Sequence, residues 1–229
     1  MFYRYIDPTY FLVMIGALLC VLAQSNVTST FSRYSRVGSR TGMTGATAAE
    51  RILRANGIYD VRVEHIGGNL TDHYDPRDKV LRLSDTVYGS TSVAAIGVAA
   101  HECGHAIQHN TGYLPLQIRG ALVPVANFGS KLCWPLILAG LFLGHTFVQI
   151  GIIMFCAVVL FQVVTLPVEF NASSRALRIL DETGMLYSDE VSSTRKVLRA
   201  AALTYVASVA SSVLQLLRLL ILFGDRRDD

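Results

Sequence analysis

The 37 residues between Lys131 and Glu169 include no Asp, Glu, Lys or Arg. A single straight helix of that length would measure about 55 Å, whereas the hydrocarbon core of a bilayer is only about 30 Å thick. The segment is therefore predicted to fold back as two membrane-spanning helices, with the turn at Gly144-His145 and 147–166 as the clearer span. Both ends of this hairpin are expected to lie on one side of the membrane.

Two further apolar segments, 10–24 and 201–223, flank the hairpin. The whole chain is 52% hydrophobic and 16% charged, with a mean hydropathy of +0.41, which is too apolar for an ordinary soluble domain. The first segment is interpreted as a retained anchor, because the residues before Gln24 make a poor signal-peptide cleavage site. The sequence thus predicts about four transmembrane helices in a multi-pass, mainly α protein.

An HExxH motif, His101-Glu102-Cys103-Gly104-His105, follows a stretch of small apolar residues at 93–100. Ser90, Thr91 and Ser92 precede that stretch and can cap a helix. On a helix of 3.6 residues per turn the two histidines project from one face and can bind the same metal, with Glu102 beside it as a base. The motif in this helical context favours a Zn²⁺ site over a chance match.

A catalytic zinc needs a third protein ligand and an open position. Thr111 stands where a metzincin would carry its third histidine, and His109 is too far from His101 along the helix to join the same site comfortably. Glu169 is the strongest carboxylate candidate, because it follows Pro167 at the end of the apolar run and is expected to begin a helix. The alternative is that Glu169 only marks the membrane boundary.

Before the motif, 44–56 has the pattern of an amphipathic helix that stops at Gly57. Two short strands are predicted around 61–66 and 80–84, joined by a turn segment at 67–78. These elements and the motif helix would form a small zincin-like α+β catalytic unit. The edge of its sheet could bind an extended peptide through backbone hydrogen bonds.

Five segments along the chain carry a resemblance that is far more specific than the motif alone. They are Thr41–Gly45, Leu70–Arg77, Lys79–Ser84, Ala100–Gln108 and Leu166–Ser173. Together they resemble the bacterial membrane family of neutral zinc metallopeptidases typified by YugP, which is related to the glutamate-zincins. The resemblance implies a location in the bacterial cell membrane and implies that Glu169 is the third zinc ligand. The broader glutamate-zincins usually carry an Asp four residues after that Glu, where this chain has Ser173.

The resulting hypothesis is a membrane-embedded zinc metalloendopeptidase that cleaves protein or peptide substrates, membrane proteins among them. His101, His105 and Glu169 would hold Zn²⁺, and Glu102 would act as the general base. Candidates for an oxyanion donor or for support of the ligands are His73, Tyr74, Arg175 and His109.

Two other functions stay open. One is a non-hydrolytic membrane scaffold or chaperone with a structural zinc, whose last coordination position would be filled by a fourth protein ligand. His109 and His145 are the candidates for that ligand. The other is a zinc hydrolase that acts on a non-peptide amide or ester.

Five regions are expected: an anchor at 1–24, the catalytic region at 25–120, the hairpin at 121–168, a third-ligand helix and cytoplasmic segment at 169–200, and a last span and tail at 201–229. Basic residues near the span ends of 25–120 and 169–200 place the site on the cytoplasmic side, although Arg226 and Arg227 argue against that orientation. The net charge of +3 suggests contact with the lipid bilayer and no nucleic-acid partner. The sequence defines no oligomeric state.

Overall fold

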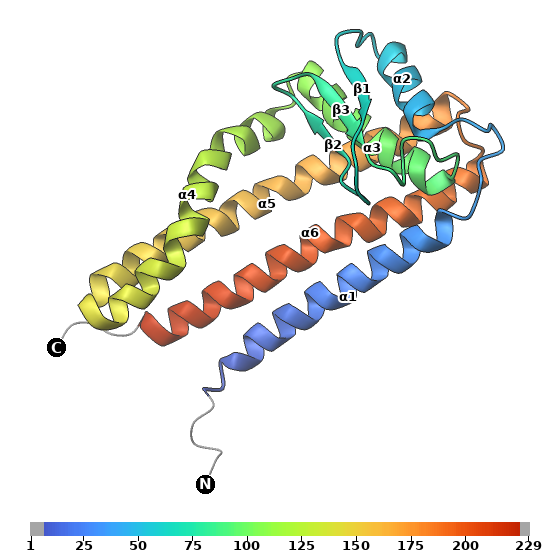
Figure 1. The fold of residues 1–229 in the computed structure, drawn as a ribbon. Coiled ribbons are helices and arrows are strands. Elements are labelled where there is room, and N and C mark those ends of the chain that lie inside the picture. The colour runs from blue at the N-terminus through green and yellow to red at the C-terminus, as the bar shows by residue number, and fades with distance from the viewer. Residues whose placement is uncertain (1–6, 225–229) are drawn as a thin grey trace. The chain divides into compact units, whose positions relative to one another are not determined.

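The computed structural model describes residues 7–224. In this range the chain forms six helices and three strands (Figure 1). In chain order they are α1 (Tyr10–Tyr34), α2 (Gly45–Ala55), β1 (Arg62–His65), β2 (His73–Asp75), β3 (Val80–Leu83), α3 (Val93–Asn110), α4 (Leu114–Leu143), α5 (His145–Glu182) and α6 (Ser188–Phe223). Helices α1, α4, α5 and α6 are long and apolar enough to cross a membrane. The predicted fold class, a multi-pass and mainly helical protein with a small sheet, is confirmed.

The chain divides into two compact units. A helical unit consists of the described parts of Met1–Gln24, Gln117–Leu166 and Leu203–Asp229. A mixed unit consists of Ser25–Leu116 and Pro167–Ala202, and it holds the sheet, α2 and α3. Arg226 and Arg227, which bear on the predicted orientation, lie outside the described residues.

In the helical unit, α4 and α5 form the expected hairpin. Gly144 lies between them with φ +119°, a backbone conformation that residues other than glycine rarely adopt. Small residues bring the two helices together, because a Cβ on Gly151 would lie 2.9 Å from the carbonyl oxygen of Cys133. Leu219 of α6 is buried in the apolar core between α4 and α5.

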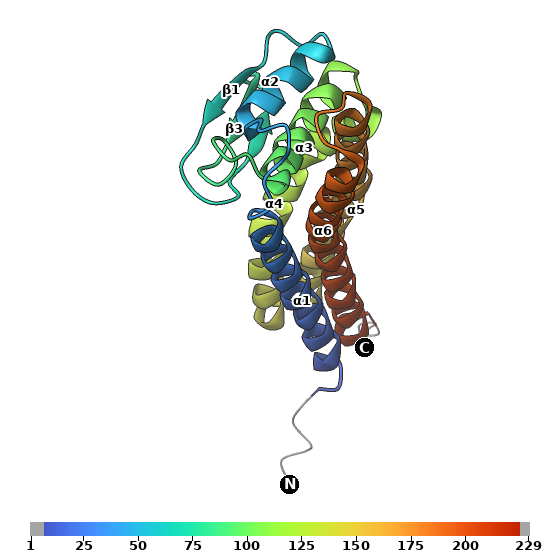
Figure 2. The same cartoon turned by 90° about the vertical axis from the view of Figure 1, so that its right-hand side faces the viewer.

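Helices α1 and α6 run side by side within the same unit, as Figures 1 and 2 both show. A Cβ on Gly16 would lie 2.7 Å from Ser211 Oγ, and Cys20 Sγ donates to the carbonyl of Ala207 at 3.7 Å. Small and weakly polar residues therefore hold these two helices in contact, as is common between membrane helices.

In the mixed unit the strand order is β1-β3-β2, with β1 parallel and β2 antiparallel to the central β3. The sheet lies beside α2 and α3 (Figure 1). Thr44 caps α2 and Ser92 caps α3, each through a side-chain oxygen that accepts a backbone N–H. Side chains from α2, α3, β3, α5 and α6 share one apolar core, and this core fixes the position of the motif helix.

Two local expectations are wrong. The strand β2 forms inside the segment expected to be a turn, because its three residues pair with β3. No new helix begins at Glu169, because α5 runs unbroken from His145 to Glu182 with Pro167 inside it. A proline removes one backbone hydrogen bond from a helix, and helices packed among other membrane helices tolerate this loss.

Candidate metal centre

Helix α3 places the HExxH motif in the core of the mixed unit. Ala94, Ala95, Ala99 and Ala100 are fully buried and let neighbouring elements approach closely. A Cβ on Gly97 would lie 2.5 Å from Thr194 Cγ2, so α3 also packs tightly against α6. The small residues before the motif thus allow close packing of the helix that carries the histidines.

The approach of α3 to α5 is closest at Gly104, between the two histidines. A Cβ at this position would lie 2.6 Å from the carbonyl oxygen and 3.0 Å from the Cα of Ala172. Only glycine fits against a backbone at that separation. Glu169 lies one helical turn before Ala172 on α5, so this contact brings the carboxylate to the histidines.

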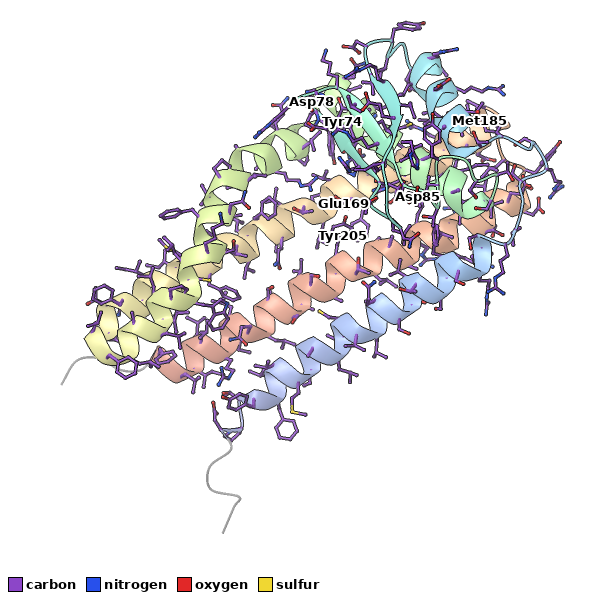
Figure 3. The ribbon with its side chains drawn as sticks, in the orientation of Figure 1. Tyr74, Asp78, Asp85, Glu169, Met185 and Tyr205 are labelled. Carbon is purple, nitrogen blue, oxygen red and sulfur yellow. The ribbon has the colours of Figure 1, made fainter. Side chains whose placement is uncertain are left out.

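His101, His105 and Glu169 gather in one cluster, with one ligand atom of each residue within 4.8 Å of the others. Glu169 Oε2 lies 3.3 Å from His101 Nε2 and 3.6 Å from His105 Nε2. Ligand bonds of about 2.0–2.1 Å in a tetrahedron separate neighbouring ligand atoms by about 3.4 Å. The donor set and its spacing therefore fit Zn²⁺. Figure 3 labels Glu169 on α5.

The three side chains are mostly buried, with exposed fractions of 16% for His101, 12% for His105 and 4% for Glu169. Burial by itself lowers the pKa of His105, but the hydrogen bond to Glu169 and the charges of Glu102 and Glu169 outweigh it. The pKa of His105 in the metal-free site is therefore raised above its ordinary value. Negative charge around the histidines favours a cation at this point, whether a proton or a metal.

The outer ring nitrogen of each histidine has a partner. His101 Nδ1 lies 3.1 Å from Ser173 Oγ, and His105 Nδ1 lies 3.0 Å from Gln108 Oε1. Such contacts orient a metal-binding imidazole. Ser173, which stands where the broader glutamate-zincins usually carry an aspartate, thus contacts His101. Gln108 was not predicted, although its position three residues after His105 on a helix was a usable signal.

The remaining motif residues have separate surroundings. Glu102, the second residue of the motif, is partly exposed. Cys103 points into the core, where its Sγ donates to the carbonyl of Ala49 at 3.6 Å, and burial raises the pKa of its thiol well above the ordinary value. Cys103 therefore packs α3 against α2 and is held as a neutral thiol.

The candidate supporting residues lie on β2, at the end of α3 and on α5. Tyr74 OH lies 2.8 Å from His109 Nδ1, which joins β2 to the end of α3, and Tyr74 is labelled in Figure 3. His73, also on β2, contacts the carbonyl of Thr71 at 2.9 Å. Arg175 lies on α5, where its Nε donates to Asn171 Oδ1 at 2.8 Å. His145 belongs to the helical unit.

Four apolar helices and a buried cluster of two histidines and a glutamate define the class of a membrane zinc protein. The chain belongs to the family described as "Putative neutral zinc metallopeptidase", whose model matches residues 9–224. It is 48% identical over 220 residues to the "Putative membrane protease YugP" of Bacillus subtilis (strain 168), and the match covers 96% of this chain and 98% of that protein. No solved structure matches the chain significantly. The predicted family and the predicted Zn²⁺ cofactor are confirmed.

Proposed function

We propose that this chain is a membrane-embedded zinc metalloendopeptidase of the glutamate-zincin type. The observation that carries the proposal is the convergence of His101, His105 and Glu169 from α3 and α5 at zinc-ligand spacing. A zinc held by only these three residues would keep one coordination position for water or substrate, as catalytic rather than structural zinc sites do. The family description and the named relative support peptide bonds as the target.

The chemistry divides between the metal and the protein. When bound, Zn²⁺ supplies a Lewis acid that acidifies water and polarises the scissile carbonyl. Glu102 adjoins His101 in the motif and is partly exposed, so its carboxylate can take the proton of the attacking water. The same carboxyl then returns that proton to the leaving amine.

The substrate is proposed to bind as an extended segment along β2. This strand is an edge of the sheet, since the order is β1-β3-β2, and one side of its backbone is unpaired by any other strand of the described sheet. Tyr74 on β2 reaches His109, one helical turn beyond His105. Burial raises the pKa of Tyr74, and the charges of Asp60 and Asp75 raise it further, so its hydroxyl stays protonated and can donate to an oxyanion.

A scaffold with a structural zinc is less well supported. That function requires a fourth protein ligand, and the cluster found among residues 7–224 has three members. His109, one of the two candidates for a fourth ligand, has its Nδ1 at 2.8 Å from Tyr74 OH. Hydrolysis of a non-peptide amide or ester would use the same groups, and cleavage of a protein substrate distinguishes a peptidase from that alternative.

The active site is proposed to face the cytoplasm of a bacterial cell. Arg33 and Arg36 at the end of α1, and Arg195, Lys196 and Arg199 on α6, are exposed or partly exposed and belong to the same mixed unit as the zinc cluster. Positive charge near span ends is typical of cytoplasmic segments.

The defining experiment incubates the purified full-length protein in detergent with an unfolded membrane protein, with and without a zinc chelator. Wild type is expected to cleave, and chelation is expected to stop cleavage. Glu102→Gln is expected to keep its zinc and lose proteolysis, because the amide keeps the size of the carboxylate but cannot accept the proton. Glu182→Gln, which changes an exposed glutamate at the end of α5, serves as the matched control. Chelator-sensitive cleavage by Glu102→Gln would rule Glu102 out as the base.

A further inference from the structure

Gln108 is a polar residue with no exposed surface, and all its side-chain contacts lead toward the metal cluster or to α5. Its Oε1 lies 3.0 Å from His105 Nδ1. Its Nε2 donates to the carbonyl of Val168 at 2.8 Å and to Asn171 Oδ1 at 3.0 Å. A buried amide is costly unless its groups are paired, and here both ends of the amide are paired.

Arg175 determines which groups donate and which accept in these hydrogen bonds. Arg175 carries only donors, so its Nε, 2.8 Å from Asn171 Oδ1, fixes that atom as the acceptor oxygen. The same oxygen has a second lone pair, which accepts from Gln108. The carbonyl of Val168 is likewise only an acceptor. Two acceptors therefore face one end of the Gln108 amide, and that end must be its NH₂ group.

The orientation of Gln108 decides the tautomer of His105. With its NH₂ group turned to α5, Gln108 presents a carbonyl oxygen to the histidine ring. His105 Nδ1 must then carry a hydrogen, which leaves the lone pair on Nε2, the atom 3.6 Å from Glu169 Oε2. A metal binds the nitrogen that carries the lone pair.

We propose that Arg175, Asn171 and Gln108 form a directed hydrogen-bond relay that sets the tautomer of His105 for zinc binding. The proposal rests on the zinc site proposed above and assigns a positioning role to three residues. The relay lies wholly in the mixed unit and runs from α5 to α3. It links α5, which carries Glu169, to α3, which carries the histidines, and one of its acceptors is the carbonyl of Val168, the residue before Glu169.

The relay gives Arg175 a positioning role in place of the oxyanion-donor role considered from the sequence. Its Nε is committed to Asn171, and its guanidinium lies 5.9 Å from the centre of the Tyr113 ring. The Arg175 side chain is thus placed between Asn171 on α5 and Tyr113, which lies just before α4. Arg175 therefore acts through Asn171 and Gln108 on His105.

The test measures zinc affinity by competition with a chromogenic chelator, and the visible absorption spectrum of the Co²⁺-substituted protein. Gln108→Leu removes both ends of the amide at similar volume, and Arg175→Met removes the donor that starts the relay. Each is expected to weaken zinc binding, by about 10- to 100-fold for Gln108→Leu and by less for Arg175→Met, and to change the cobalt spectrum. Arg178→Met removes the same charge from an exposed position one turn along α5 and is expected to match wild type.

Asn171 provides a pair of variants that separates the relay from a loss of packing. Asn171→Asp keeps an oxygen that can accept from both Arg175 and Gln108, so zinc affinity and the cobalt spectrum are expected to be retained. Asn171→Leu removes the acceptor and is expected to resemble Gln108→Leu. Equal losses in the Asp and Leu variants would overturn the relay, even if Gln108→Leu proved too unstable to purify.

His105→Ala separates this proposal from the zinc site on which it rests. Loss of zinc from His105→Ala, together with wild-type affinity and spectrum in Gln108→Leu and Arg175→Met, would overturn the relay alone. Wild-type zinc binding by His105→Ala would overturn the zinc site and the relay with it.

Discussion

Replacing Gly104 by alanine should damage the proposed zinc site without changing any of its proposed ligands. The added Cβ would lie 2.6 Å from the carbonyl oxygen of Ala172, whereas ordinary contacts begin at 3.4 Å. The obstructing atoms belong to the backbone of α5, so a rotamer change cannot relieve the contact. Helices α3 and α5 must therefore separate locally by about 0.8 Å.

That separation is large compared with what the metal tolerates. Glu169 lies one turn from Ala172, and its Oε2 is 3.3 Å from His101 Nε2. Zinc-ligand distances hold to within about 0.2 Å, so a shift several times larger cannot be absorbed at all three ligands. We expect zinc affinity to fall about 10-fold or more. Overpacking should also lower the free energy of unfolding by about 1–3 kcal/mol.

The assay compares zinc affinity and thermal unfolding in detergent for wild type, Gly104→Ala and Gly120→Ala. Gly120 is also in a helix, but a Cβ there would meet nothing within 4 Å. Gly120→Ala should keep its zinc affinity and gain up to about 1 kcal/mol, because alanine has the higher helix propensity. Wild-type zinc affinity and stability in Gly104→Ala would refute the argument that this close approach positions the ligands.

Two further predictions concern topology and pH. In a cysteine-free background, cysteines introduced at Ser39 and Ser188 should both resist an impermeant reagent in intact cells, while one at His145 should react. Labelling of Ser39 and Ser188 on opposite sides of the membrane would contradict the helical hairpin. Labelling of both from outside would place the proposed active site on the outer side of the membrane. Zinc must displace a proton from His105, whose pKa is raised in the metal-free site, so zinc affinity should begin to fall at a higher pH than the ordinary histidine value of 6.5 predicts. Titration of zinc affinity against pH checks this, and a fall that begins only below 6.5 would contradict it.

Local physics made much of the fold predictable from the sequence. Thr44 and Ser92 cap α2 and α3 because their side chains accept backbone N–H groups, and this depends on neighbouring residues alone. Gly144 marks the hairpin turn for a similar reason. The spacing of His101 and His105 follows from helix geometry. Each of these signals lies within a few residues of the feature that it predicts.

Features that depend on distant residues were harder to predict. Strand β2 has three residues, too few for a periodic pattern, and forms only by pairing with β3. Gln108 resembles a surface residue of α3 until α5 supplies Val168 and Asn171 as acceptors. The position of Glu169 in the sequence made it a candidate and left the membrane-boundary interpretation open, and the family resemblance was needed to favour a ligand role, because its approach to the histidines depends on the packing of α5 against Gly104.

Metal analysis of the purified protein decides whether Glu169 completes a three-ligand zinc site with the motif histidines. Purified wild type should hold one zinc per chain, and Glu169→Ala should lose most of it, because two neutral imidazoles alone bind zinc weakly. Glu182→Ala removes an exposed carboxylate from the same helix and should retain full zinc. Full zinc occupancy in Glu169→Ala would rule Glu169 out as a zinc ligand.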